Sequence, residues 1–280
     1  MRAILTLAGA EFVTMRRNLF SIVMVLTLVL TVAGFYLVPD GDQRTIAAGR
    51  AGNDAIAAAA MTEDLPVRYL GERREPVGNR TNLIINLIVF EVLILPFVFI
   101  GVNLFQEKQD GTIRAYRVTP GGTGTYVAAK MLLWTVLTIL YGVALLLLTV
   151  GLNLSLFAWA SMIMLFTVAG LFISAFGLLF ALFFSSISAW FLPGISILLV
   201  SQLPIVSYLF PAFSPRWLTW FPTYRLLYAV RDILTIGPSG LMGPGEAIGG
   251  ALLYLVALAG VATIAVRAAA ARVLMKEARI

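Results

Sequence analysis

Residues 19–38 read LFSIVMVLTLVLTVAGFYLV, which is twenty consecutive residues without a charge. An α-helix rises about 1.5 Å per residue, so this run forms a helix of roughly 30 Å, the thickness of the hydrocarbon core of a bilayer. The run is too long, and the charged segment before it too extended, for a secretory signal peptide. The stretch therefore predicts a transmembrane helix.

Five further apolar runs follow, at about 82–105, 126–152, 157–184, 188–210 and 246–266. None of them has the period-two alternation of a transmembrane β-strand. The chain as a whole is 60% hydrophobic and 12% charged, far outside the range of soluble domains. The sequence thus predicts an all-α integral membrane protein, with residues 1–280 forming one domain of six transmembrane helices.

Several classes of chemistry are excluded by composition. The chain has no cysteine and no histidine, which removes disulfides, Cys/His metal sites and the usual nucleophile–base pairs of hydrolases. No close pair of acids lies inside a predicted span, so we expect no enzyme and no metal site. The sequence GxxxxGK[ST] is also absent, so the chain holds no P-loop of its own. The net charge of +6 is spread along the chain, so we expect no nucleic acid partner.

Lysine and arginine placement predicts the orientation of the chain. With a cytoplasmic N-terminus, the inner side carries eleven basic and four acidic residues, and the outer side carries nine of each. Six spans return the chain to its starting side, so both termini are expected in the cytoplasm. Residues 39–81 and 211–245 then lie outside, and residues 106–120 face the cytoplasm.

Two segments outside the spans have amphipathic patterns. In residues 1–18, apolar residues recur at helical spacing beside Glu11, Arg16 and Arg17, which indicates either a helix in the membrane interface or a plain charged leader to the first span. In residues 211–245, apolar residues between Pro222 and Gly237 share one helical face. This segment is expected to be a short interfacial or re-entrant helix, the alternative being a membrane-hugging connector.

Polar residues and prolines occur inside spans two and five. Span two contains Asn86, Glu91 and Asn103, and span five contains Pro193, Gln202 and Pro204. A carboxylate near the bilayer centre costs at least ~2.5 kcal/mol, so it normally faces a protein interior or water. These six residues are either part of a translocation path or internal packing contacts between helices.

The polar stretch 106–120 reads QEKQDGTIRAYRVTP. Its segment Glu107–Ile113, followed by Thr119-Pro120, resembles the motif E-R/K-E-x-G-T-L…S/T-P found between spans two and three of type-2 ATP-binding-cassette (ABC) exporter permeases. It departs from that motif at Gln109 and Arg114, where acids are usual, which alters the charges that a partner must present. Ala10-Glu11-Phe12 with Arg16-Arg17 resembles the family's interfacial helix. Residues 215–234 are similar to its outer segment, with Phe221 where Asn is common.

The resemblance implies a six-helix half-transporter. It would pair with a second permease chain, identical or different, and with two separate ATPase subunits that bind ATP and Mg, while this chain binds no cofactor. Its coupling segment would dock on the ATPase through charges and a turn at Gly111. The residues assigned to this coupling are Glu107, Lys108, Asp110, Gly111, Thr112, Arg114, Arg117, Thr119 and Pro120.

We therefore expect an exporter permease in a bacterial or archaeal plasma membrane, moving a drug-like or other amphiphilic small molecule. In the family, spans two and five flank the path, in keeping with Asn86, Glu91, Asn103, Pro193, Gln202 and Pro204 as path residues. The alternative is a secondary transporter driven by protons through Glu91.

Overall fold

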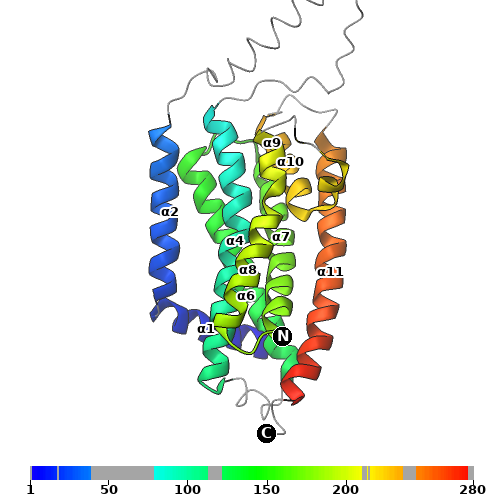
Figure 1. The fold of residues 1–280 in the computed structure, drawn as a ribbon. Coiled ribbons are helices and arrows are strands. Elements are labelled where there is room, and N and C mark those ends of the chain that lie inside the picture. The colour runs from blue at the N-terminus through cyan, green and yellow to red at the C-terminus, as the bar shows by residue number, and fades with distance from the viewer. Residues whose placement is uncertain are drawn as a thin grey trace, which may run out of the picture.

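The computed structural model describes residues 2–17, 19–38, 79–112, 122–209, 213, 215–235 and 244–276. Long helices stand side by side in one bundle, and α1 (Arg2–Arg17) lies across one end of it (Figure 1). The upright helices are α2 (Leu19–Leu37), α4 (Asn79–Gln109), α6 (Gly122–Thr149), α7 (Leu156–Leu182), α8 (Ile187–Ser201) with α9 (Leu203–Leu209), and α11 (Pro244–Lys276).

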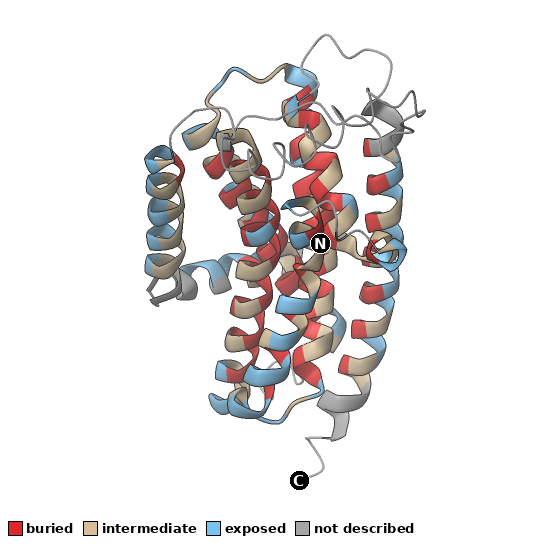
Figure 2. Cartoon of the chain, turned by 45° about the horizontal axis from the view of Figure 1, so that its top comes forward, coloured by how far each residue is buried: buried red, intermediate tan, exposed pale blue. Residues whose placement is uncertain are grey.

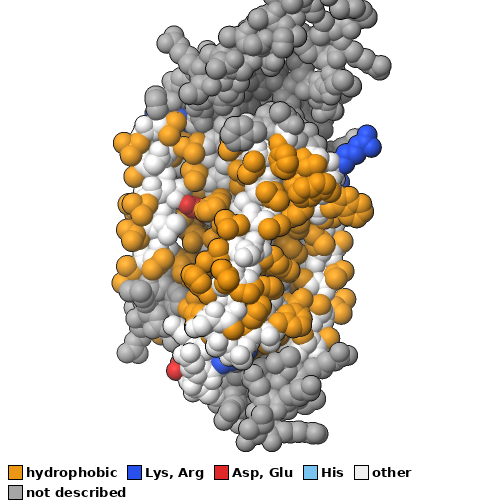
Figure 3. Space-filling view, viewed as in Figure 1, with side chains coloured by type: hydrophobic (Ala, Val, Ile, Leu, Met, Phe, Trp, Pro, Cys, Tyr) orange, Lys and Arg blue, Asp and Glu red, His pale blue; other side chains and the backbone are white. Residues whose placement is uncertain are grey.

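The prediction of an all-α membrane protein is confirmed. The described residues contain no strand, five helical segments are long and apolar enough to cross a membrane, and Ser21–Leu37 is a shorter apolar helix. Hydrophobic side chains dominate the face of the molecule seen in Figure 3. Many of them project outward from α8 and α11, among them Leu199, Leu253 and Ile264. Lipid tails solvate such surfaces, whereas water does not.

Helix α4 is longer than the apolar run that predicts it. It begins at Asn79 and continues through the polar residues Gln106–Gln109, which hydropathy assigns to a loop. Its 31 residues span about 46 Å, which exceeds the roughly 30 Å of the hydrocarbon core. Both ends of α4 therefore reach the headgroup region, where charged side chains are solvated.

The predicted fifth span is broken between α8 and α9, at Gln202. Pro204 has no amide N–H to continue the helical ladder, so the chain tightens into a short turn there. Thr223 of the next helix donates its hydroxyl to the carbonyl of Ser201 at 2.5 Å, so an end of α8 is satisfied by a neighbour. The span thus consists of two helices joined at Gln202.

Helix α7 is the centre of the bundle and packs against α4, α6 and α11. Small residues allow the close approach of α6: a Cβ on Gly170 would lie 3.2 Å from the Cα of Thr135, and one on Gly142 would lie 2.7 Å from the ring of Phe166. Small residues at helix contacts are typical of membrane bundles, in which dispersion contacts replace the hydrophobic drive. Buried residues accordingly concentrate on the inward faces of α4, α6 and α7 (Figure 2).

The segment before α11 is helical rather than an irregular connector. A 3-10 turn (Arg216–Trp220) leads into α10 (Pro222–Thr235), whose apolar face packs onto α4 and α11. Trp217 and Trp220 remain exposed beside it, as interfacial tryptophans do. Helix α1 packs on α2 and α6, and the side chains of Glu11, Arg16 and Arg17 lie outside what the structure describes.

Candidate functional site

A group of four side chains joins α4 to α6 at one end of the bundle, and we call it the end cluster: Asn103, Glu107, Tyr126 and Lys130. Lys130 forms an ion pair with Glu107 and donates to Oδ1 of Asn103 at 2.8 Å. The hydroxyl of Tyr126 donates to Oε2 of Glu107 at 2.5 Å. Each helix contributes two residues four positions apart, which places them on one face.

The two charged groups of the end cluster are largely buried, so each depends on its partners for stabilisation. Lys130 is only 1% exposed, and the side chain of Glu107 is 15% exposed. Removing an ammonium from water costs several kcal/mol, which the carboxylate, the amide oxygen and the face of the Tyr126 ring at 5.6 Å together offset. The charges therefore hold the end of α4 in one position on α6.

Lys108 ties the same end of α4 to the turn between α7 and α8. Its Nζ donates to the carbonyl oxygen of Phe184 at 2.9 Å and lies 5.3 Å from the centre of the Phe105 ring. Phe184 lies just beyond the last residue of α7, where carbonyl groups lack helical partners and attract a cation. The end of α4 is thus fastened to α6 and to the α7–α8 turn through two neighbouring residues.

The chain leaves α4 immediately after this fastening. Gln109 and Asp110 are exposed, and Gly111 has a φ of 69°, the left-handed conformation that glycine adopts without strain. Thr112 is partly buried, and Arg114, Arg117, Thr119 and Pro120 lie outside the described residues. Glu107, expected to offer its charge to a partner, is turned inward, and Asp110 is the acid of the stretch that lies exposed.

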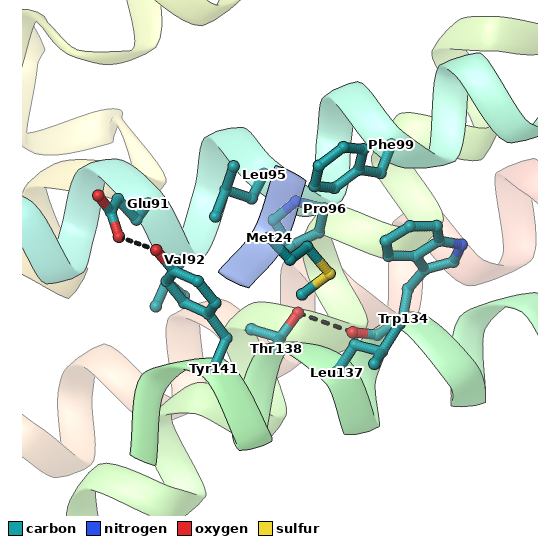
Figure 4. A pocket seen from close by; sticks show the side chains of 10 residues that line it. All are labelled: Met24, Glu91, Val92, Leu95, Pro96, Phe99, Trp134, Leu137, Thr138 and Tyr141. Atoms are coloured by element: carbon teal, nitrogen blue, oxygen red, sulfur yellow. Dashed lines mark hydrogen bonds between the residues drawn. The ribbon is translucent and has the colours of Figure 1, made fainter. Parts of the chain in front are cut away.

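A second cluster, the mid-span cluster, consists of Thr31, Glu91 and Tyr141. Glu91 is 5% exposed, and its two carboxylate oxygens accept one hydrogen bond each, from the hydroxyls of Thr31 and Tyr141. Figure 4 shows Glu91 and Tyr141 facing each other beside a small cavity that Met24, Pro96 and Trp134 also line. The cavity measures about 10 Å³, space for no more than one water molecule. Glu91 therefore joins α2, α4 and α6.

The predicted path residues of α4 do not share the same hydrogen-bond partners. Glu91 and Asn103 form their hydrogen bonds with α2 and α6. Near the other end of α4, Asn82 accepts from Tyr208 of α9 at 2.6 Å, and Asn86 Nδ2 donates to the carbonyl of Asn82.

Asn86 and Gln202 keep buried acceptor atoms. Asn86 Oδ1 and Gln202 Oε1 have no partner among the described residues. Pro204 is buried beside Gln202, whereas Pro193 is exposed. A buried acceptor without a hydrogen bond is costly in an apolar setting. Asn86 on α4 and Gln202 at the α8–α9 break therefore each carry an unsatisfied acceptor, whereas both carboxylate oxygens of Glu91 accept hydrogen bonds.

Sequence reasoning missed the partners of both acids. Lys130 is one of the eleven basic residues that charge placement assigns to the inner side, and the sequence predicts no role for Tyr126, Tyr141 or Thr31. A signal existed for Lys130: it lies inside the predicted span 126–152, four residues after a tyrosine, in the helix that returns from the polar stretch. An antiparallel pair of helices brings such a lysine level with Glu107.

Among the described residues, no three Asp or Glu side chains gather as a metal site.

The family described as "ABC-2 family transporter protein" matches residues 43–267, which is well over half of the chain. No curated protein sequence matches the chain at a significant level.

Proposed function

The chain belongs to the ABC-2 transporter family, and from this we propose that it is the membrane subunit of an ATP-driven exporter. Members of the family are transmembrane permease subunits that generally pair with ABC ATPase subunits. The finer part of the proposal concerns the direction of transport, the coupling segment and the cargo. ATP and Mg would be bound by the partner ATPase.

One observation carries the proposal, namely the fastening of the α4 end beside the exposed turn. Asp110 and Gly111 follow directly on Glu107 and Lys108, whose side chains are bonded to α6 and to the α7–α8 turn. A force applied at the turn therefore acts on α4, α6 and α7 together instead of bending one helix end. This arrangement supports the coupling role that the motif implies for residues 106–120.

Coupling by this route is a rigid-body mechanism. Closure of the ATPase pair displaces the docked turn, and the ion pair of Lys130 with Glu107 carries the displacement into α6. Asp110, which is exposed, would supply docking charge, and Glu107 would act behind the surface as a positioning residue. The orientation with α1, the end cluster and the Lys276 end of α11 in the cytoplasm belongs to the same proposal (Figure 1).

For the cargo, we propose an amphiphilic, drug-like small molecule. Support comes from the broken α8–α9 span, where an apolar surface adjoins buried polar acceptors: Leu199 and Val206 are exposed near Gln202 in sequence. A second permease chain would cover part of this surface and enclose the path, as the family resemblance implies.

The alternative of a proton-driven transporter rests on Glu91 alone. Both carboxylate oxygens of Glu91 are occupied by hydroxyls, and among the described residues it has no ion-pair partner. A proton relay across the membrane requires a series of titratable groups along the path. We therefore place the exporter first.

Association with an ATPase tests the docking turn. We expect Asp110→Lys to reduce the amount of P-loop ATPase that co-purifies from native membranes by about tenfold, because a like charge placed at an interface is strongly unfavourable. Asn153→Lys is the matched control, since it puts the same side chain on an exposed turn at the opposite end of the bundle. Equal recovery of the ATPase with both variants would count against the docking role of the turn.

Direction and energy source are tested in everted membrane vesicles. We expect ATP-dependent accumulation of a fluorescent amphiphilic dye inside the vesicles, lost in vesicles that lack the ATPase. Accumulation that persists without the ATPase and collapses with the proton gradient would favour the alternative.

A further inference from the structure

An open groove lies between α7 and α11, about halfway along both helices, and we call it the α7–α11 groove. Its volume is about 420 Å³, which is within the usual range of ligand-binding sites. Its lining includes Val168 and Leu171 of α7, and Val256, Gly260 and Ile264 of α11. These residues belong neither to the two clusters described above nor to the α8–α9 surface that a second permease chain would cover.

The lining of the groove is apolar and leaves room for a chain that runs along the helices. Thr263 donates its hydroxyl to the carbonyl of Ala259 in its own helix at 2.6 Å, so its polar group is already satisfied. Val256 is 53% exposed and Ile264 is 72% exposed, whereas a Cβ on Gly260 would meet no atom within 4 Å. The groove follows α11 over residues 256–264, about 12 Å along the axis, and therefore suits a hydrocarbon chain.

Arg267 follows the groove on the same face of α11. It lies three positions after Ile264 and four after Thr263, and these spacings bring side chains together on one side of a helix. The Arg267 side chain is exposed and forms no hydrogen bond or ion pair with any residue that the structure describes. An arginine in a membrane-spanning helix normally has a partner, so an exposed one without a protein partner points to a ligand.

The depth of Arg267 brings its guanidinium to the lipid headgroups. The span Ile248–Ala271 has 24 residues, and its midpoint lies next to Gly260. Arg267 is seven positions further on, about 10 Å from the midpoint, whereas half of the hydrocarbon core measures roughly 15 Å. The long side chain of an arginine covers the remaining distance. The Lys276 end of α11 lies at the same end of the bundle as the end cluster, so the headgroups belong to that leaflet (Figure 1).

We propose that the α7–α11 groove and Arg267 together bind an anionic phospholipid of this leaflet. One acyl chain lies in the groove, and the planar fork of the guanidinium binds two oxygens of the phosphate. Charge favours a lipid over an apolar helix of another chain, because such a helix would leave the guanidinium without a counter-charge. The inference rests on the membrane fold and is independent of the transport direction and of the ATPase.

Photo-labelling of the purified full-length chain tests the proposal. The chain is equilibrated in detergent with phosphatidylglycerol that carries a diazirine on one acyl chain, and labelled residues are identified by mass spectrometry. We expect the label on α7 near Leu171 and on α11 within residues 256–264. A diazirine diacylglycerol, which lacks the phosphate, should label the same residues about tenfold less at equal concentration.

The headgroup contact is tested by a charge variant. We expect Arg267→Gln to lower the labelling of the groove by phosphatidylglycerol about tenfold, because the phosphate loses its charged donor. Arg216→Gln is the matched control, since Arg216 is also exposed but lies outside the groove, and it should leave the labelling unchanged.

A groove variant keeps the test decisive if Arg267→Gln fails to fold. Gly260→Leu fills the groove without displacing an atom and leaves Arg267 intact, so labelling should fall about tenfold while the chain elutes as a single species. Gly250→Leu makes the same change on the same helix, also in open space but outside the groove, and should have no effect.

Four results would overturn the proposal. Labelling that is unchanged in Gly260→Leu, or reduced equally in Gly250→Leu, would deny the groove its acyl chain. Equal labelling by diacylglycerol would deny Arg267 its phosphate, and displacement of the lipid by glycerol phosphate would identify a site for free anions. Since the chain has no cysteine, disulfide-linked dimers of Gly260→Cys in native membranes would place a second copy in the groove instead.

Discussion

Two acids of the same helix, Glu91 and Glu107, solve the same problem in different ways. They lie sixteen positions apart on α4, about 24 Å along its axis, and each accepts a hydrogen bond from a tyrosine of α6. Glu107 adds a lysine, whereas Glu91 adds only a threonine hydroxyl. At the membrane end a full ion pair is built, and at mid-span neutral donors suffice. The comparison teaches that depth in the membrane, and not the helix, decides which partner a carboxylate takes.

The largest effect is expected at the end cluster. Glu107→Ala leaves Lys130 buried without its counter-charge, so the free energy of unfolding should fall by about 3–5 kcal/mol, measured by SDS titration in mixed micelles. The double variant Glu107→Gln with Lys130→Met removes both charges and should recover most of this loss. A loss as large in the double variant would show that shape, not charge, governs the cluster.

At the mid-span cluster the effect should be smaller and of a different kind. Glu91→Ala leaves the hydroxyls of Thr31 and Tyr141 without their acceptor, and we expect a loss of about 1–3 kcal/mol in the same titration. Glu91→Gln should change the free energy of unfolding by less than about 1 kcal/mol, because hydroxyls both donate and accept. The two clusters would be equivalent, and the comparison would fail, if Glu91→Ala lowered the free energy of unfolding as much as Glu107→Ala.

The smallest effect separates the attachment of α2 from the stability of the bundle. Thr31→Val removes one hydrogen bond between α2 and α4, which in membrane proteins contributes about 0.6 kcal/mol on average. Thr27→Val is the matched control, since Thr27 donates only to Val23 of its own helix at 2.8 Å. Limited proteolysis should release α2 faster in the Thr31 variant than in the control, and equal rates would deny Glu91 its role in holding α2.

Much of the fold follows from run lengths alone. Hydrocarbon thickness fixes how many apolar residues a span needs, so residues 126–152 and 157–184 predict α6 and α7 to within a few positions. Helix ends are harder to predict, because hydropathy measures solvation and not hydrogen bonding. The polar residues Gln106–Gln109 stay helical in the headgroup layer, where water and backbone bonds are both available.

The partners of polar side chains could not be predicted in the same way. Apolar residues surround helix α4 on all sides, so their periodicity does not distinguish the face toward α6 from the face toward α9. Glu107 and Lys130 are 23 positions apart, and only the antiparallel packing of α4 and α6 brings them level. Among the six residues grouped as a path, Glu91 and Asn103 bond to α2 and α6, whereas Asn86 bonds within α4.

Trp190 of α8 packs directly against α4. A Cβ on Gly101 would lie 2.5 Å from its indole ring, which also stacks on Phe97 at 5.7 Å between centroids and is 2% exposed. Its Nε1 has no hydrogen-bond partner among the described residues. Of the five tryptophans in the chain, this one lies in the seam where α8 would part from α4. In a variant that keeps Trp190 and replaces the other four tryptophans with phenylalanine, its fluorescence would report whether that seam opens during turnover.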